Sequence, residues 1–163
     1  MTDWEQMLAA IASPTPTEAA YDLCRALTQR EIGTMLFTVM SYDPATQRSR
    51  RTYSDNQTAY PLSGEKPLSV GIWSETVIDR RAPFIANTID DIAVVFPDHP
   101  LILSLGLGSV LNVPIIAGDG VRATINMLHE TGHFTPERVQ KALALTPFYA
   151  MATLAAMAVG EAQ

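Results

Sequence analysis

The spacing of apolar residues predicts two helices at the N-terminal end of the chain. Four apolar residues recur with the i, i+3, i+4, i+7 spacing of one helix face, namely Trp4, Met7, Leu8 and Ile11. A Ser-Pro-Thr-Pro segment then interrupts the pattern. Thr15 stands before a proline and three positions ahead of Glu18, which predicts a capping box at the start of a second helix. Gly33 is expected to end that helix.

After the second helix the pattern changes to the two-residue alternation and short apolar runs of β-strands. We expect strands over residues 34–42, 48–53, 82–87, 109–117 and 121–128. Turns are expected at 43–46 and 118–120, each joining antiparallel neighbours. A helix over about residues 69–80 follows the first two strands. A last helix is expected to begin at Thr135 and to be kinked by Pro147.

This order of elements predicts an α+β fold. Hairpins require antiparallel pairing, and helices from both ends of the chain tend to cover one face of a sheet. The segment 87–107 is then left to cover the other face, and such a cover leaves a cavity more often than a packed helix does. We therefore expect an antiparallel sheet with terminal helices on one face and a ligand cavity on the other. Residues 1–14 should form an N-terminal helical segment and residues 15–163 one domain.

The composition is that of a folded, acidic domain. Of the 163 residues, 47% are hydrophobic and 17% are charged, and the formal net charge is −6. A field of this sign repels phosphate backbones and anionic lipids, so we expect no nucleic-acid or membrane partner. The uncharged, alanine-rich segment 142–160 is expected to be a buried helix rather than a membrane span. Asp3 and Glu5 stand where a secretory signal carries positive charge, which favours a cytoplasmic location.

Four stretches resemble the GAF domain family, a small-molecule sensor fold related to PAS domains. They are the strand 105–115, the hairpin 118–127, the helix start 134–137 and the strand 82–87. Together they extend the resemblance over about residues 15–160. The family often has arginine where Gly108 stands, glycine where Ala123 stands and aspartate where Asn87 stands. The resemblance implies a free-standing domain that binds a small molecule and has no output module within these residues.

Cysteine chemistry known from some members of that family is not expected in this chain. Reduction of methionine sulfoxide requires a reactive cysteine with resolving partners, and a bilin requires a cysteine for its attachment. The chain has one cysteine, Cys24, at helical spacing from Tyr21 and Leu27. That spacing predicts a buried thiol that packs as a small apolar side chain. A single cysteine also excludes an internal disulfide.

The string His129-Glu130-Thr131-Gly132-His133 has the letters of a zinc-protease motif. That motif works only on a helix, which places both histidines on one face. Here the string follows a strand pattern and precedes a helix start, so we expect a polar loop, no zinc protease and no metal site. His129 and Glu130 are still candidates for ligand contacts at the rim of the cavity.

Polar and aromatic residues near the expected cavity are the candidate ligand contacts. They are Tyr42, Trp73, Phe96, Ser109, Asn112, Asn126 and His129. Asn126 alternates with Ile125 and Met127, which should meet the helices, so Asn126 should face the cavity or cap a loop backbone. Arg48, Arg50 and Arg51 form the basic cluster of the chain and fit either a solvated strand edge or an anion-binding patch.

Three functions fit this pattern. The preferred one is a binding domain, with a sensing or carrier role, for a small organic or anionic molecule and with no cofactor. The alternative is a small cofactor-independent enzyme with acid–base residues in the same cavity, from among Asp91, His99, His129 and Glu130. The third is an interaction module whose cavity is filled by its own side chains.

The final helix is apolar around most of its circumference, so we expect it to be buried on most sides. Two copies of the chain pairing through their terminal helices would achieve this. The other possibility is that the first helix folds back over the apolar stripe within one chain. We prefer the homodimer.

Overall fold

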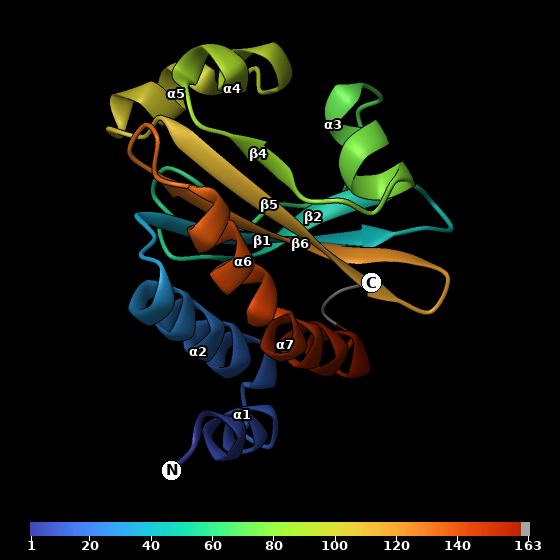
Figure 1. Cartoon of the computed structure of the whole chain (residues 1–163). Coiled ribbons are helices and arrows are strands. Elements are labelled where there is room, and N and C mark those ends of the chain that lie inside the picture. Colours follow the sequence, from blue (N-terminus) through green and yellow to red (C-terminus); the bar gives the residue numbers. More distant parts are fainter. Residues whose placement is uncertain (161–163) are drawn as a thin grey trace.

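One antiparallel sheet forms the middle of the molecule, and the computed structural model describes residues 1–160 (Figure 1). Its strands are β1 (Leu36–Asp43), β2 (Arg48–Ser54), β3 (Lys66–Pro67), β4 (Phe84–Ala86), β5 (Ser109–Ala117) and β6 (Gly120–His129). They lie in the order β3-β2-β1-β6-β5-β4. The long strands β1, β5 and β6 fall where the sequence has apolar runs or alternation, and the α+β fold class is confirmed.

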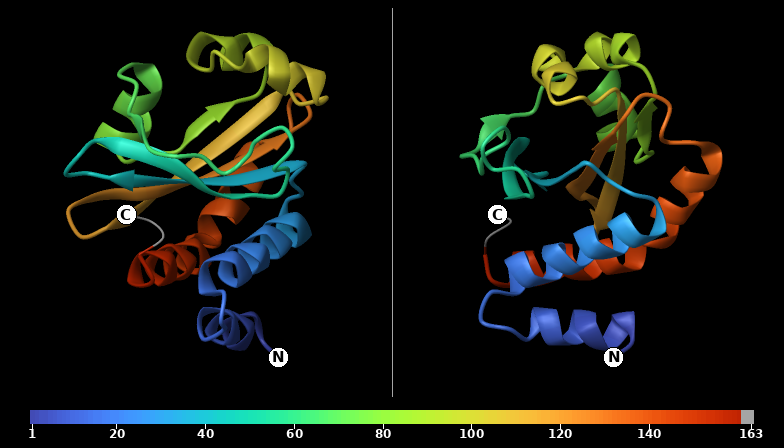
Figure 2. Two further views of the ribbon diagram at one scale, coloured as in Figure 1. Left: turned by 180° about the vertical axis from the view of Figure 1, so that it is seen from behind. Right: turned by 90° about the vertical axis from the view of Figure 1, so that its left-hand side faces the viewer.

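Helices from both ends of the chain cover one face of the sheet. They are α1 (Asp3–Ile11), α2 (Pro16–Glu31), α6 (Pro136–Ala144) and α7 (Thr146–Ala158). Figure 2 shows α2 and α7 side by side against the sheet, and α1 packs on both of them. The core between helices and sheet contains fully buried side chains from both layers, among them Tyr21, Phe37, Ile125, Met127 and Tyr149.

Two reciprocal tyrosine–threonine pairs connect α2 to α7 inside this core. The Tyr21 hydroxyl lies 3.1 Å from Thr153 Oγ1, and the Tyr149 hydroxyl lies 2.7 Å from Thr28 Oγ1. Each threonine donates its own proton to a backbone carbonyl one helical turn earlier, Thr28 to that of Cys24 and Thr153 to that of Tyr149. Both tyrosines therefore donate to the threonines, and every hydroxyl of the set is satisfied.

Short helices lie over the other face of the sheet. They are α3 (Ile72–Ser74), which continues as a π-helical turn (η1, Glu75–Asp79), α4 (Ile89–Val95) and α5 (His99–Ser104). Figure 1 shows them on the side opposite α2 and α7. A smaller apolar cluster that includes Ile92, Ile102 and Val110 attaches α4 and α5 to the sheet. The segment expected to cover this face, 87–107, does so with two helices, and the 66–74 segment joins it.

A β-bulge in β2 interrupts the alternation of its side chains. Val39 of β1 pairs with Tyr53. The next residue, Met40, pairs with Arg51, so Thr52 has no partner on β1. Tyr53 therefore packs in the helix-side core, whereas Arg51 faces the opposite side of the sheet.

Two predicted helix signals differ from the structure and one is confirmed. The side chain of Thr15 makes no capping hydrogen bond, because its backbone (φ −125°, ψ 66°) lies outside the extended region that a capping residue adopts. A capping box forms instead at Thr2, whose hydroxyl accepts from the Glu5 N–H while the Glu5 carboxylate accepts from the Thr2 N–H. The helix expected from about residue 69 begins only at Ile72. A break of 46° separates α6 from α7 just before Pro147, as expected.

No single helix within residues 1–160 has the length and apolar composition to cross a membrane. The bent pair of α6 and α7 reaches those values only when both helices are counted together. Within the chain, α7 packs on α2 and on β5.

The first helix covers part of the apolar stripe of α7. The Trp4 ring stacks on Phe148 with 4.2 Å between ring centroids, and Met7 is fully buried. Leu154 of α7 and Leu8 of α1 nevertheless stay 52% and 57% exposed. The first helix therefore folds back on part of α7, and the exposed Leu154 and Leu8 still leave an apolar surface that a second copy could cover. Residues 161–163 of the predicted domain lie outside the described residues.

A close approach before β5 requires glycine at position 108. The Gly108 N–H donates to the His129 carbonyl, and a Cβ at this position would overlap Thr131 Oγ1 and lie 3.1 Å from the Thr131 nitrogen. An arginine, which the family often has here, would require the 129–133 loop to move.

We predict that Gly108→Ala lowers the free energy of unfolding by about 1–3 kcal/mol, because the added methyl group overpacks this contact. Gly64→Ala is the matched control, since nothing lies within 4 Å of a Cβ built there. Urea denaturation of both variants measures the effect. Equal stability of the two variants would contradict the packing described at Thr131.

Candidate functional site

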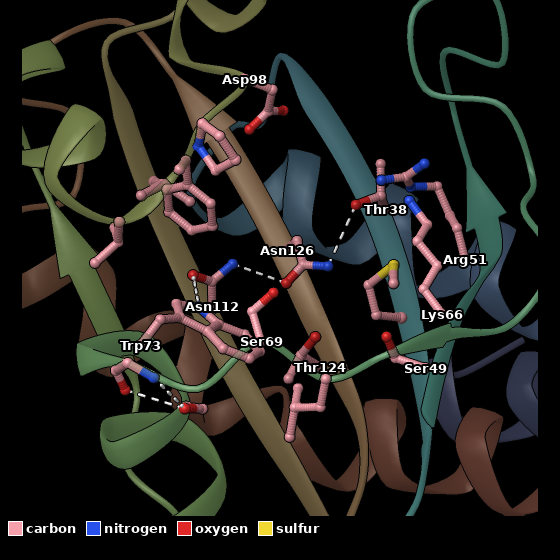
Figure 3. Close-up of a pocket in the computed structure, with 18 of the residues that line it drawn as sticks. Thr38, Ser49, Arg51, Lys66, Ser69, Trp73, Asp98, Asn112, Thr124 and Asn126 are labelled. Carbon is pink, nitrogen blue, oxygen red and sulfur yellow. Dashed lines mark hydrogen bonds between the residues drawn. The ribbon is translucent and has the colours of Figure 1, made fainter. Parts of the chain in front are cut away.

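A cavity of about 640 Å³ lies between the sheet and the short helices. Its floor is the face of β1, β2, β5 and β6 that points away from α2 and α7, and its walls are the segments 66–74 and 94–98. Figure 3 shows this space with polar side chains converging on it from the strands. The volume falls in the range of small-molecule sites, roughly 300–1,000 Å³.

Aromatic rings form part of the walls. Tyr42 of β1 and Trp73 of α3 face each other with 6.1 Å between ring centroids. Phe96 follows α4 and packs edge-to-face on Phe84 with centroids 5.9 Å apart. Burial raises the pKa of Tyr42, so its hydroxyl stays protonated and neutral at physiological pH. These rings offer an apolar surface to a bound molecule.

A chain of hydrogen bonds crosses the floor of the cavity from α3 to β1. Trp73 Nε1 donates to Asn112 Oδ1 over 2.9 Å, and Asn112 Nδ2 donates to Asn126 Oδ1 over 2.7 Å. Asn126 Nδ2 then donates to Thr38 Oγ1 over 3.3 Å. The strand register explains the alignment, because Asn112 pairs with Asn126 and Asn126 pairs with Thr38 (Figure 3). We call these four residues the amide chain.

Two cations line the cavity on β2 and β3. Arg51 Nη1 donates to the Pro61 carbonyl over 3.0 Å, and the guanidinium lies 5.1 Å from the centre of the Tyr60 ring. Its Nε has no hydrogen-bond partner within residues 1–160. Burial lowers the pKa of Arg51, and Tyr60 and Asp98 nearby act in the opposite direction. Lys66, the second cation, is exposed at the rim.

One carboxylate also lines the cavity. Asp98 Oδ2 accepts a hydrogen bond of 2.6 Å from the Tyr60 hydroxyl. Burial and this bond to Asp98 raise the pKa of Tyr60. Tyr60 therefore holds its proton and orients the carboxylate at the wall.

The structure brings five of the predicted ligand contacts together and leaves two outside. Tyr42, Trp73, Phe96, Asn112 and Asn126 all line the cavity. The other two, Ser109 and His129, pair with each other at the ends of β5 and β6 and share the face of Leu111 and Met127. Two-residue alternation thus turns them away from the cavity. The Ser109 hydroxyl donates to the Glu130 carbonyl over 2.6 Å.

The four residues proposed as acid–base groups of an enzyme do not meet in the cavity. Asp91 lies in the exposed first turn of α4, and His99 Nδ1 lies 3.0 Å from the Phe96 carbonyl. His129 is the last residue of β6 and Glu130 follows it in the loop before α6, and neither lines the cavity.

Sequence reasoning missed several residues that line the cavity. They are Thr38, Ser49, Tyr60, Lys66, Ser69, Asp98 and Thr124. Thr38 and Thr124 had a usable signal, because they alternate with buried residues in the same way as Asn126. Of the three clustered arginines only Arg51 lines the cavity, while Arg48 Nε lies 3.4 Å from the Glu65 carboxylate. The buried thiol of Cys24 agrees with its predicted core position, and burial raises its pKa.

The zinc-protease string forms a turn rather than a helix, as its context predicted. The rings of His129 and His133 stack in parallel, 3.6 Å apart at 7°. His133 Nε2 lies 2.7 Å from the Ile32 carbonyl and so donates to it. Burial, and then the neighbouring His133, lower the pKa of His129, whose Nδ1 accepts from the Glu130 N–H. Within residues 1–160 no three His, Cys, Asp or Glu side chains are grouped to hold a metal ion.

We predict that the purified protein contains no stoichiometric zinc, because stacked rings cannot direct two nitrogens to one tetrahedral ion. Elemental analysis of protein purified without chelators tests this. One zinc per chain that is lost in His133→Ala would contradict the prediction.

Comparisons with known proteins agree with the α+β fold described above. A family model for the GAF domain matches residues 13–153, whereas no curated protein matches the chain. The GAF domain of a two-component sensor histidine kinase from Bacillus halodurans has a TM-score of 0.69 and 12% identity, covering 86% of this chain and 95% of that one. The GAF domain of a phosphoenolpyruvate-protein phosphotransferase from Coxiella burnetii has a TM-score of 0.69 and 16% identity, covering 97% and 94%.

A third similar structure is the chromophore-binding domain of a bacteriophytochrome from R. palustris. Its TM-score is 0.61 at 15% identity, and the match covers 98% of this chain but 63% of that one. At these identities the likeness establishes the fold. Because the family model extends over most of the residues and solved GAF domains share the architecture, the chain belongs to the GAF domain family.

Proposed function

We propose that this domain binds a small organic or anionic molecule in the cavity and acts as a sensor or carrier of it. The observation that carries the proposal is a cavity of about 640 Å³ with aromatic walls and a floor of polar side chains that are only partly bonded to one another. Asn112 Nδ2 and Asn126 Nδ2 on this floor each make one of the two hydrogen bonds that they can donate within residues 1–160. A bound molecule with acceptor groups would satisfy the second.

The similar structures support a sensing role. One is the GAF domain of a sensor histidine kinase, and another is the chromophore-binding domain of a bacteriophytochrome. The first is part of a sensor, and the second binds a small molecule. The cavity argues against the interaction module, since its own side chains do not fill it. The separation of Asp91 and His99 from the cavity floor argues against the enzyme.

Copurification tests the proposal directly. Native mass spectrometry of freshly purified protein should detect a bound small molecule. Ser69→Trp, which adds a large ring at the cavity wall, should remove it, and Thr46→Trp in the exposed β1–β2 turn is the matched control. A bound molecule retained by Ser69→Trp would contradict the site. If nothing copurifies, and a fragment screen finds no molecule whose binding Ser69→Trp abolishes, the proposed function is wrong.

Asn126 is expected to contribute strongly to affinity. We predict that Asn126→Leu folds but loses about 1–3 kcal/mol of unfolding free energy, because Asn112 and Thr38 lose a buried hydrogen-bond partner. Binding of the copurified molecule should weaken about tenfold or more, since the variant removes the second N–H of Asn126, which the bond to Thr38 leaves free for a ligand. Calorimetry measures the affinity. Unchanged affinity would remove Asn126 from the binding site.

We also propose that the domain is a homodimer through its terminal helices and works in the cytoplasm. The exposed apolar side chains of Leu154 on α7 and Leu8 on α1 support the dimer. The free, buried Cys24 is compatible with a reducing compartment.

The dimer is tested by a charge in the expected seam. Leu154→Glu should give folded monomers, whereas Leu103→Glu on α5, similarly exposed at 58%, should leave the dimer unchanged. Light scattering gives the mass of each species. A wild-type monomer at micromolar concentration would contradict the dimer outright.

A further inference from the structure

We infer that the ligand is an organic carboxylate that carries a second hydrogen-bond acceptor, separated from the carboxylate by a short apolar segment. The inference rests on the proposed function and assigns a chemical class to the molecule in the cavity. The carboxylate binds at Arg51 and Lys66, and the second acceptor binds at the amide chain.

The direction of the amide chain is set by Trp73. An indole N–H donates and cannot accept, so the atom of Asn112 facing it is the amide oxygen. The Asn112 nitrogen then donates to Asn126, and the Asn126 nitrogen donates to Thr38. Thr38 therefore receives a hydrogen bond and keeps its own proton for a further acceptor. Both amide nitrogens also retain a second N–H, so this floor offers donors to a ligand.

The strand register places the cations next to the end of this chain. Arg51 pairs with Met40, which stands two residues from Thr38 on the same face of β1. Lys66 pairs with Ser49, which stands two residues from Arg51 on the same face of β2. Such diagonal neighbours are about 7–8 Å apart and within reach of long side chains. Figure 3 shows the ends of Arg51 and Lys66 on the Thr38 side of the cavity.

The charges around the cavity favour one negative group. Within residues 1–160 the charged residues that line it are Arg51, Lys66 and Asp98. Neither cation forms a salt bridge in this part of the chain, and Asp98 is occupied by the Tyr60 hydroxyl. The lining is thus net positive by one charge, although the whole chain is net negative by six. One carboxylate balances this charge and can accept from the guanidinium N–H groups that the Pro61 carbonyl leaves free.

The spacing of the strands sets the separation of the two polar groups. Asn126 on β6 and Arg51 on β2 are two strand spacings apart, roughly 10 Å between backbones, and the arginine side chain shortens that gap. Met40 lies between them on β1 and is part of the lining. A few methylene groups over Met40 would connect the carboxylate to the second acceptor.

The test uses 6-acetamidohexanoate and its amide, 6-acetamidohexanamide, which has the same shape without the charge. NMR titration of the full chain should show that the acid binds at least about tenfold more tightly than the amide, because charge-assisted hydrogen bonds are the stronger ones. Hexanoate, which lacks the second acceptor, should bind more weakly than 6-acetamidohexanoate.

Arginine variants one residue apart provide the matched control. Arg51→Gln should remove the preference for the acid, whereas Arg50→Gln, which removes the same charge from the opposite face of β2, should keep it. Lys66→Gln should weaken binding of the acid by about twofold to fivefold, since exposed charge pairs contribute little. Lys66 is exposed and unpaired, so this variant decides the question if Arg51→Gln does not fold.

The outcomes separate this inference from the proposed function. Equal affinity for acid and amide, with both lost in Ser69→Trp, would overturn the carboxylate class and leave a small-molecule site. Failure of all three probes to bind at low-millimolar concentration would also overturn the class, and the copurification experiment would then decide the site independently. An acid preference that persists in both Arg51→Gln and Lys66→Gln would contradict the assigned anion subsite.

Discussion

The alternation of side chains across a single sheet decides the role of nearly every residue in β1, β5 and β6. Ile125 and Met127 face α2 and α7 and are fully buried, whereas Asn126 between them faces the cavity. The helix layer seals only one face with apolar contacts. Polar side chains on the other face must therefore form hydrogen bonds with one another or with a bound ligand, since a buried polar group without a partner costs about 1–3 kcal/mol. The cavity and its chemistry follow from this unequal covering.

Local patterns in the sequence predicted the fold well, because strand alternation, turn residues and helix starts depend on neighbours along the chain. The same reasoning placed Asn126 on the face away from the helices. It failed for Ser109 and His129, which were chosen because they lie near the cavity mouth. Two-residue alternation from Leu111 and Met127 would have placed both on the helix-side face. Lys66 and Ser69 had no such signal, since the two-residue pairing of β3 with β2 is a tertiary contact that brings their segment to the cavity.

Net charge proved a poor guide to the chemistry of the interior. The acidic balance of the chain describes its outer field, and it bears on partners as large as nucleic acids or membranes. A cavity is governed instead by the few groups that line it, because water and salt screen distant surface charges while nearby charges act strongly in a partly desolvated site. Arg51 belongs to the basic cluster of the sequence with Arg48 and Arg50. Arg50, however, lies on the opposite face of β2, and Arg48 pairs with Glu65.

Because of the bulge at Thr52, the net charge of the cavity lining depends on the length of β2 as well as on its residue types. Deleting that one residue would restore regular alternation, so that either Arg51 would leave the cavity or Tyr53 would leave the core. A related chain in which Arg51 left the cavity for this reason would have a lining with no net charge, because Lys66 and Asp98 would balance each other. Insertions and deletions in this strand are therefore a route by which ligand preference diverges while the scaffold persists, and alignments that treat β2 as gap-free would conceal it.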